Sequence, residues 1–146
     1  MKKTSLLERI HSAHRWLQAL ESSRRDYGTG HLLYSADIHT IVAVSQHHGC
    51  NLTELAEALG VSKPAAFKFV RKLTRLGYLV KTPAPQSGRE VELRLTTLGE
   101  SAVTAHHDFE KRTFGPLRAV EARLSPHDHA VVTRFLADLQ HVIDRM

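Results

Sequence analysis

Residues 62–89 read SKPAAFKFVRKLTRLGYLVKTPAPQSGR, and this stretch decides the fold. It holds seven basic residues and no acidic one, and the nearest acids are Glu57 before it and Glu90 after it. Its first half begins with Ser62, a good helix N-cap, and then repeats apolar residues at helical spacing. After Gly77 the pattern becomes that of a β-hairpin. A basic helix followed by a basic hairpin suits duplex DNA, with the helix in the major groove and the hairpin on the backbone or in the minor groove.

A shorter helix is predicted immediately before this one. Asn51 opens it, Glu54 completes a loose capping box, and Gly60 supplies the residue that ends it. A turn of two or three residues then leads to the helix that Ser62 caps. Two helices in this order form a helix-turn-helix motif.

The hairpin is predicted to form a wing. The strands are expected at Tyr78–Lys81 and Val91–Leu95, joined by a loop at residues 82–89 that is rich in Pro, Ser and Gly. Upstream, Ser35 is expected to cap a helix that runs to about His47. A hairpin directly after the second helix of the motif extends it to a winged helix.

Long helices are predicted at both ends of the chain. Residues 4–26 carry an apolar stripe, and Tyr27–Gly30 is a turn signal. A long helix starts near Thr97, and Gly115-Pro116 should kink or interrupt it. The expected fold is mainly α with a small β-hairpin wing. It comprises an N-terminal helix and turn at 1–34, a winged helix-turn-helix domain at 35–96, and C-terminal helices at 97–146.

Composition narrows the class of protein. The net charge of +5 favours polyanionic partners, and the single cysteine, Cys50, rules out an internal disulfide framework. The first sixteen residues lack the apolar run of a signal peptide, and no segment is apolar enough to span a membrane. We therefore expect a soluble cytoplasmic protein. Because no nucleophile–base pair, phosphate-binding glycine loop or paired carboxylates are visible, an enzyme is not expected.

The basic stretch also predicts which residues contact DNA. Side chains in the first turns of the recognition helix reach base edges, where lysine donates to guanine and where Ala65 or Phe67 can touch thymine methyls. Core packing is the alternative for Phe67. Basic residues further along contact phosphates, which position the protein without reading sequence. The predicted DNA-binding residues are Ser62, Lys63, Ala65, Phe67, Lys68, Arg71, Lys72, Arg75 and Arg89.

Four segments resemble the MarR (multiple antibiotic resistance regulator) family of bacterial winged-helix regulators. They are LTELAEALGVSKPAAFKFVRKLTRLGYLVK, GREVELRLTTLGESA, the histidine-bearing DIHTIVAV and AHHDF, and LSPHDHAVVTRFLADL. The resemblance implies a homodimer whose shared core is made by helices from both chain ends. The two recognition helices would then face one palindromic operator in adjacent major grooves. One departure is the triplet Ser87-Gly88-Arg89, where the family usually has Asp-Arg-Arg.

The resemblance also implies an effector, and it leaves alternatives open. The family's small-ligand pocket lies between the dimerisation helices and the winged helix, so that Trp16, Tyr34, His39 and Phe109 are candidate lining residues. Some members sense zinc through histidines and acids of these regions, which makes His39, His106 and His107 candidate ligands. The alternative for these histidines is a structural hydrogen bond.

The expected function is therefore a ligand-responsive repressor that requires no cofactor. The alternatives are a zinc-responsive regulator on the same fold and an architectural DNA binder without an effector.

Overall fold

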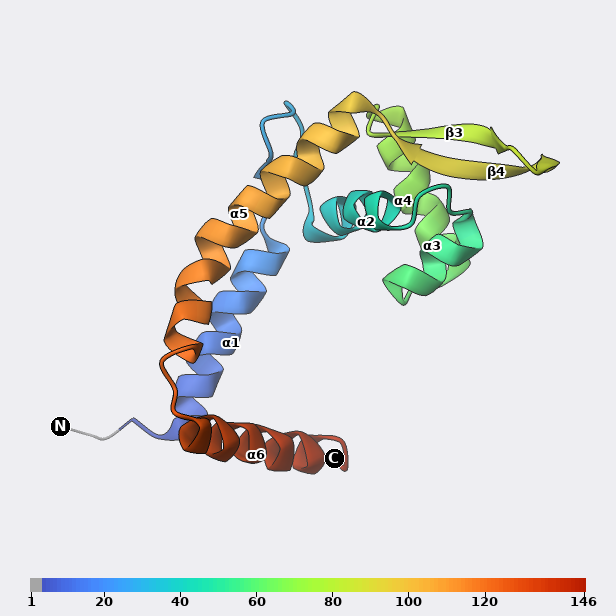
Figure 1. The fold of residues 1–146 in the computed structure, drawn as a ribbon. Helices are drawn as coiled ribbons and strands as arrows, with labels where there is room; N and C mark the ends of the chain where they lie inside the picture. Colours follow the sequence, from blue (N-terminus) through green and yellow to red (C-terminus); the bar gives the residue numbers. More distant parts are fainter. Residues whose placement is uncertain (1–3) are drawn as a thin grey trace. The chain divides into compact units, whose positions relative to one another are not determined.

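The computed structural model describes residues 4–146, except for the side chain of Arg89. Within this range the chain forms six helices and two small antiparallel sheets (Figure 1). Two compact units result, one ending at His106 and the other beginning at His107. The predicted fold class, mainly α with a β-hairpin wing, is confirmed. The elements are α1 (Leu6–Ser22), β1 (Arg25–Asp26), β2 (Leu32–Leu33), α2 (Ser35–Gln46), α3 (Leu52–Leu59), α4 (Lys63–Arg75), β3 (Leu79–Ala84), β4 (Ser87–Leu95), α5 (Thr97–Glu121) and α6 (Pro126–Ile143).

Local capping sets the limits of the helix-turn-helix. At the start of α3, the Asn51 side chain accepts from the backbone N–H of Glu54, whose carboxylate accepts from the N–H of Asn51, both at 2.9 Å. Gly60 then adopts a left-handed conformation with φ of +64°, which ends the helix. The Ser62 hydroxyl accepts from the N–H of Ala65 at the start of α4. The predicted capping of both helices is confirmed.

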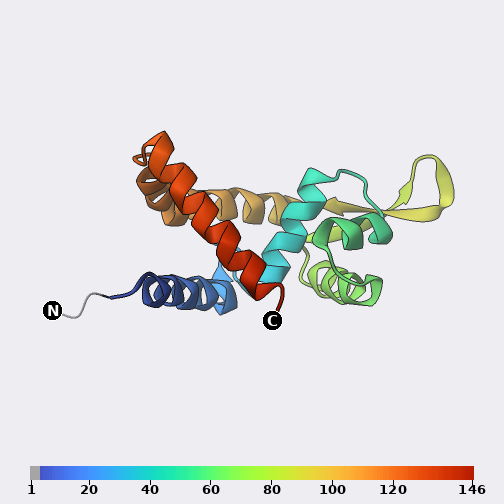
Figure 2. The same cartoon turned by 90° about the horizontal axis from the view of Figure 1, so that it is seen from below.

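The core of the first unit lies among α2, α3, α4 and the base of the wing. These elements lie together in both views, with the wing projecting from them (Figure 2). The Tyr78 side chain is fully buried at the junction between α4 and β3. Other fully or almost fully buried side chains are Leu33, Ile38, Thr40, Ile41, Val44, Leu55, Val70, Leu73 and Leu79.

The wing is longer and its turn tighter than the sequence predicted. Leu79 pairs with Leu95 at the base, and Pro83 still pairs with Val91. Because β3 is an edge strand, it tolerates a proline, and the pairing shifts register just after Pro83. The expected eight-residue loop is thus wrong, and a two-residue turn joins β3 to β4.

The entry to α2 also differs from the prediction. The first helix ends at Ser22, and residues 25–33 form a short hairpin, β1–β2, around the predicted turn. The N-cap residue of α2 is Tyr34 and not Ser35. The reason is Asp37, whose carboxylate accepts from the Tyr34 N–H at 2.9 Å and thereby fixes the first turn one residue earlier.

Helix α5 continues through Pro116, so the predicted interruption is wrong. Proline removes the hydrogen bond to the carbonyl four residues earlier, which belongs to Arg112. Both Arg112 and Pro116 are exposed, so water can replace that bond. None of the described helices has the length and apolarity needed to cross a membrane.

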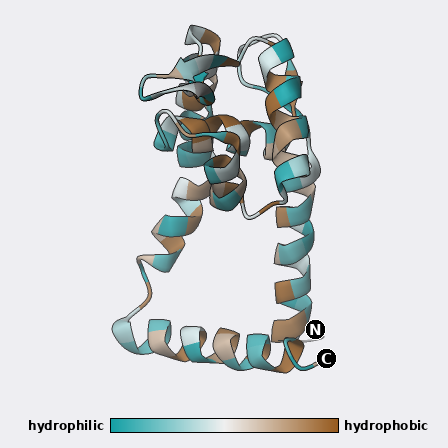
Figure 3. Ribbon diagram, turned by 90° about the vertical axis from the view of Figure 1, so that its right-hand side faces the viewer, coloured by the Kyte–Doolittle hydropathy of each residue, from teal (hydrophilic) through white to brown (hydrophobic). Residues whose placement is uncertain are grey.

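The two end helices keep their apolar side chains partly exposed. In α1, every residue is at least partly exposed, and Leu6 and Leu7 are 63% and 60% exposed. The same holds along α6, where apolar residues recur at helical spacing (Figure 3). Its exposed apolar residues are Val131, Val132, Phe135, Leu136, Val142 and Ile143. Each helix therefore carries an apolar face that the described residues of its own unit leave partly exposed.

Candidate nucleic-acid interface

Helix α4 has one buried face and one basic face. Ala66, Val70 and Leu73 are buried against the core. The opposite face is exposed and, because α4 contains no Asp or Glu, carries positive charge only. Ala65 is half-buried at its border. The exposed predicted residues here are Ser62, Lys63, Phe67, Lys68, Arg71 and Arg75.

Phe67 does not pack into the core. Its side chain is 47% exposed, and Lys63 and Arg71 lie one turn before and one turn after it on the same row. The Lys81 ammonium of β3 lies over the ring, 5.6 Å from its centroid. Lys81 belongs to the basic stretch at residues 62–89 but is not among the predicted DNA-binding residues. The side chain of Arg89, the predicted wing contact, lies outside the described residues, whereas its backbone belongs to β4.

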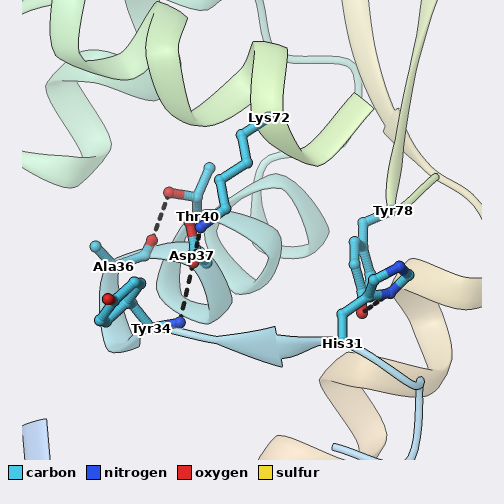
Figure 4. Close-up of polar contacts among 7 residues, drawn as sticks. All are labelled: His31, Tyr34, Ala36, Asp37, Thr40, Lys72 and Tyr78. Carbon is cyan, nitrogen blue, oxygen red and sulfur yellow. Dashed lines mark hydrogen bonds and ion pairs between the residues drawn. The ribbon is translucent and has the colours of Figure 1, made fainter. Parts of the chain in front are cut away.

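Lys72 differs from its neighbours because it has an internal ionic partner. Its ammonium lies 2.5 Å from the carboxylate of Asp37, whose side chain is only 3% exposed (Figure 4). The same carboxylate oxygen accepts from the Tyr34 N–H. The Lys72 ammonium also lies 5.3 Å from the centroid of the Tyr34 ring. One carboxylate therefore connects the start of α2 with the middle of α4.

A second polar cluster ties the β1–β2 turn to the base of the wing. The Tyr78 hydroxyl lies 2.5 Å from the Thr29 hydroxyl. It also lies 3.0 Å from Nδ1 of His31 (Figure 4). Asp26 accepts from the backbone N–H groups of Thr29 and Gly30, which fixes the turn. Burial raises the pKa of the Tyr78 hydroxyl. The phenol thus stays protonated at neutral pH and remains a hydrogen-bonding group.

A cleft of about 740 Å³ lies beside the Asp37–Lys72 pair. Two of the predicted effector-pocket residues, Tyr34 and His39, line it. The other two do not: Trp16 is 46% exposed on α1, and Phe109 is half-buried on α5 in the second unit. The lining residues are Glu21, Tyr34, Ser35, Ala36, Asp37, His39, Lys68, Phe69 and Lys72.

The structure brings together two of the three candidate zinc ligands. The rings of His39 and His106 meet edge to face at 5.6 Å between centroids, and Tyr27 contacts His106 at the same distance. His106 is buried, whereas His107 is exposed, as expected of adjacent helical residues. Among the described residues, no three His, Cys, Asp or Glu side chains gather closely enough to hold a metal ion. Within one chain, residues 4–146 thus bring together two of the four ligands that a structural zinc site uses.

Cys50 is buried after α2. Burial raises the pKa of its thiol, and the nearby Glu54 carboxylate adds to the effect. The thiol is therefore protonated at neutral pH, which is unlike the thiolate of a reactive cysteine.

Comparisons with known proteins agree with this geometry. The model of the MarR family matches residues 33–91. The uncharacterized HTH-type transcriptional regulator YhjH of Bacillus subtilis is 24% identical over 72% of this chain and 65% of its own length. The transcriptional regulator AdcR of Streptococcus pneumoniae is 28% identical over 69% of this chain and 68% of its own. The chain thus spans about two thirds of the length of these relatives.

Solved structures share the fold over nearly the whole chain. ZitR of Lactococcus lactis, in complex with DNA, superposes with a TM-score of 0.75 at 17% identity, covering 97% of this chain and 99% of ZitR. The family match covers α2, α3, α4 and most of the wing, which are the elements that build the basic face described above. Residues 33–91 therefore match the MarR family, and the chain has the winged helix-turn-helix fold of the DNA-binding transcriptional regulators that it resembles.

Proposed function

We propose that the protein is a repressor that binds a palindromic DNA operator as a homodimer and is released by a small-molecule effector. The observation that carries this proposal is the exposed basic face of α4, flanked by a wing. Lys63 and Lys68 would reach base edges, and Arg71 and Arg75 would contact phosphates. A protein with this role would act in the cytoplasm.

Binding is tested by fluorescence anisotropy with duplex from the gene's own upstream region and with random duplex, across a salt series. We expect a preference of about 10³ or more for the specific duplex. Replacing Arg71 with Met should weaken binding to both duplexes and lower the salt slope by about one. Lys111→Met, on the exposed surface of α5, is the matched control. A protein without any sequence preference would instead be an architectural binder, and the proposal would be wrong.

The apolar faces of α1 and α6 support the homodimer. A second copy would cover them, and each fully buried Leu, Ile or Val contributes about 1.5–3 kcal/mol. Leu136→Glu should shift the molecular mass measured by light scattering from dimer to monomer. Arg134→Glu places the same carboxylate on the polar side of α6 and should leave the dimer intact. A wild-type protein that is monomeric at micromolar concentration would refute this part of the proposal.

The cleft beside Lys72 supports the effector. Tyr34 supplies an aromatic face, and Lys68 supplies a cation, whereas Lys72 is paired with Asp37 and Glu21 adds a negative charge. A small aromatic ligand with a single carboxylate therefore suits the lining. Because Lys68 belongs to α4 and Tyr34 caps α2, a ligand that binds both in one arrangement of the two helices would shift the population towards it. Thermal-shift screening of aromatic carboxylates followed by anisotropy tests this. A compound that raises the melting temperature yet leaves DNA affinity unchanged is not the effector.

Zinc is the alternative effector. Its support comes from relatives, because ZitR is described as zinc-responsive and AdcR as zinc-dependent. The His39–His106 contact brings two ligands together, so further ligands would have to approach on binding. The wild-type protein should then bind DNA tightly only with zinc, and a chelator should abolish this binding. Zinc should not change the DNA affinity of His39→Ala, whereas it should raise that of the exposed control His127→Ala as it does for the wild type. A DNA affinity that is the same with zinc and with chelator would exclude this alternative.

A further inference from the structure

Phe67 is an apolar side chain in the middle of a basic surface. About half of it is exposed, so that part of the ring contributes little to folding. Cations surround it on two elements: Lys63, Lys68 and Arg71 on α4, and Lys81 on β3. Their placement means that whatever covers the ring must also accommodate positive charge.

A DNA duplex meets both requirements at once. A protein partner that covered Phe67 would have to remove water from the surrounding ammonium and guanidinium groups, which is costly unless it carries matching acids. The major groove places phosphates along its rims and offers an apolar group on its floor, the C5-methyl of thymine. The Lys81 ammonium occupies a position over the ring, which leaves the rest of the exposed ring surface for a base.

We propose that Phe67 determines sequence specificity by packing its ring against the methyl group of one thymine in each half-site. Lys81 is the positioning residue: its ammonium lies over the ring and holds recognition helix and wing in one arrangement. This inference rests on the proposed DNA-binding function. It assigns to Phe67 a different task from that of the basic residues, since a ring contact reads a base whereas a phosphate contact does not.

The size of the effect follows from the methyl group. Removing one buried methyl from the DNA, by replacing thymine with deoxyuridine, should weaken binding about fourfold in one half-site. The same replacement in both half-sites should weaken it about fifteenfold, because separate contacts add. Phe67→Ser should lose this sensitivity and should bind random duplex as tightly as the wild type. Lys81→Met should leave the protein able to bind DNA but reduce its sensitivity to deoxyuridine below fourfold, because the Phe67 ring is then held less firmly.

The experiment uses a duplex that the protein itself selects. The full-length wild-type protein enriches its preferred sequence from a random library of 30-base-pair duplexes. That duplex is then synthesised with each thymine replaced singly by deoxyuridine, and affinities are measured for wild type, Phe67→Ser and Val80→Ser. Val80, 40% exposed on the neighbouring position of β3, is the matched control because it is an exposed apolar residue outside α4. Melting temperatures verify that all variants fold.

Three outcomes are distinguishable. In the first, replacing one particular thymine in each half-site weakens DNA binding by the wild type and by Val80→Ser about fourfold and does not change binding by Phe67→Ser. This outcome supports the inference. In the second, every thymine replacement lowers the DNA affinity of the wild type and of Phe67→Ser by the same factor. This outcome overturns the inference but does not contradict the proposed function. Failure of the wild type to enrich any sequence overturns both.

Discussion

The shared carboxylate of Asp37 predicts strong energetic coupling between α2 and α4. Lys72→Met removes the cation and leaves a nearly buried carboxylate with the Tyr34 N–H as its described donor. Breaking a fully buried ion pair from one side costs about 3–5 kcal/mol. Because the Lys72 side chain is 34% exposed, water screens part of the interaction, and we expect a loss of about 2–3 kcal/mol.

Asp37→Asn tests the other partner. The amide oxygen can still accept from the Tyr34 N–H, so the cap survives while the charge is lost. We expect the free energy of unfolding to fall by about 1–2 kcal/mol. The double variant should cost about as much as Lys72→Met alone, which gives a coupling of about 1–2 kcal/mol.

Urea unfolding followed by circular dichroism measures these values. Protein concentration must be the same for all variants, because the stability of an oligomer depends on it. Lys68→Met is the matched control: it removes a lysine from the exposed face of α4 and should change stability by less than about 0.5 kcal/mol. If the two single losses add to within about 0.3 kcal/mol, the carboxylate does not couple the helices and the reasoning fails.

Three further results are expected. Gly99→Ala should lower stability by about 2–3 kcal/mol in a thermal melt, because an added Cβ would meet the Tyr78 carbonyl oxygen; an unchanged melting temperature would contradict this contact. Tyr78→Phe should cost about 1–2 kcal/mol at pH 7 through the lost contacts with Thr29 and His31. Since burial raises the Tyr78 pKa, its contribution is full below its ordinary value near 10 and is lost as pH rises through the folded value. The urea midpoint should therefore fall less between pH 8 and pH 11 in Tyr78→Phe than in the wild type. The same fall in both proteins would refute this. Cys50 should react with a thiol reagent only as the protein unfolds, since burial and Glu54 raise its pKa; rapid reaction of native protein would show otherwise.

Local signals account for what the sequence predicted well. The caps at Asn51 and Ser62 act within three residues, and the left-handed Gly60 needs no distant partner. Apolar spacing identified the buried side of α4 and so indicated its basic side. These features are determined by neighbours in the sequence, and the helix-turn-helix follows from them directly.

The features that the sequence did not predict depend on distant residues or on solvent. Lys72 and Asp37 are 35 positions apart, and no local pattern distinguishes Lys72 from the other cations of α4. The contact of Tyr78 with Thr29 spans 49 positions. The predictions made from the two prolines were wrong for a different reason. Pro83 lies in an edge strand and Pro116 on an exposed helix surface, and at both places a missing backbone N–H costs little.

The cleft was predicted in part for the same reason. Tyr34 caps α2 and His39 lies in its second turn, and both line the cleft. Lys68 and Phe69 come from α4, and their presence in the lining depends on how α2 and α4 pack. Trp16 and Phe109 were chosen as aromatic residues of the right regions, which does not fix where a side chain points.

The location of the buried core has a consequence for synthesis on the ribosome. Every buried side chain of the described residues lies between Tyr27 and His106, and the second unit begins only at His107. All residues of the winged-helix core are therefore translated before the first residue of α6. The apolar face of α1 is made first and that of α6 last, so the two helices that a second copy would cover are synthesised at opposite ends of the DNA-reading unit.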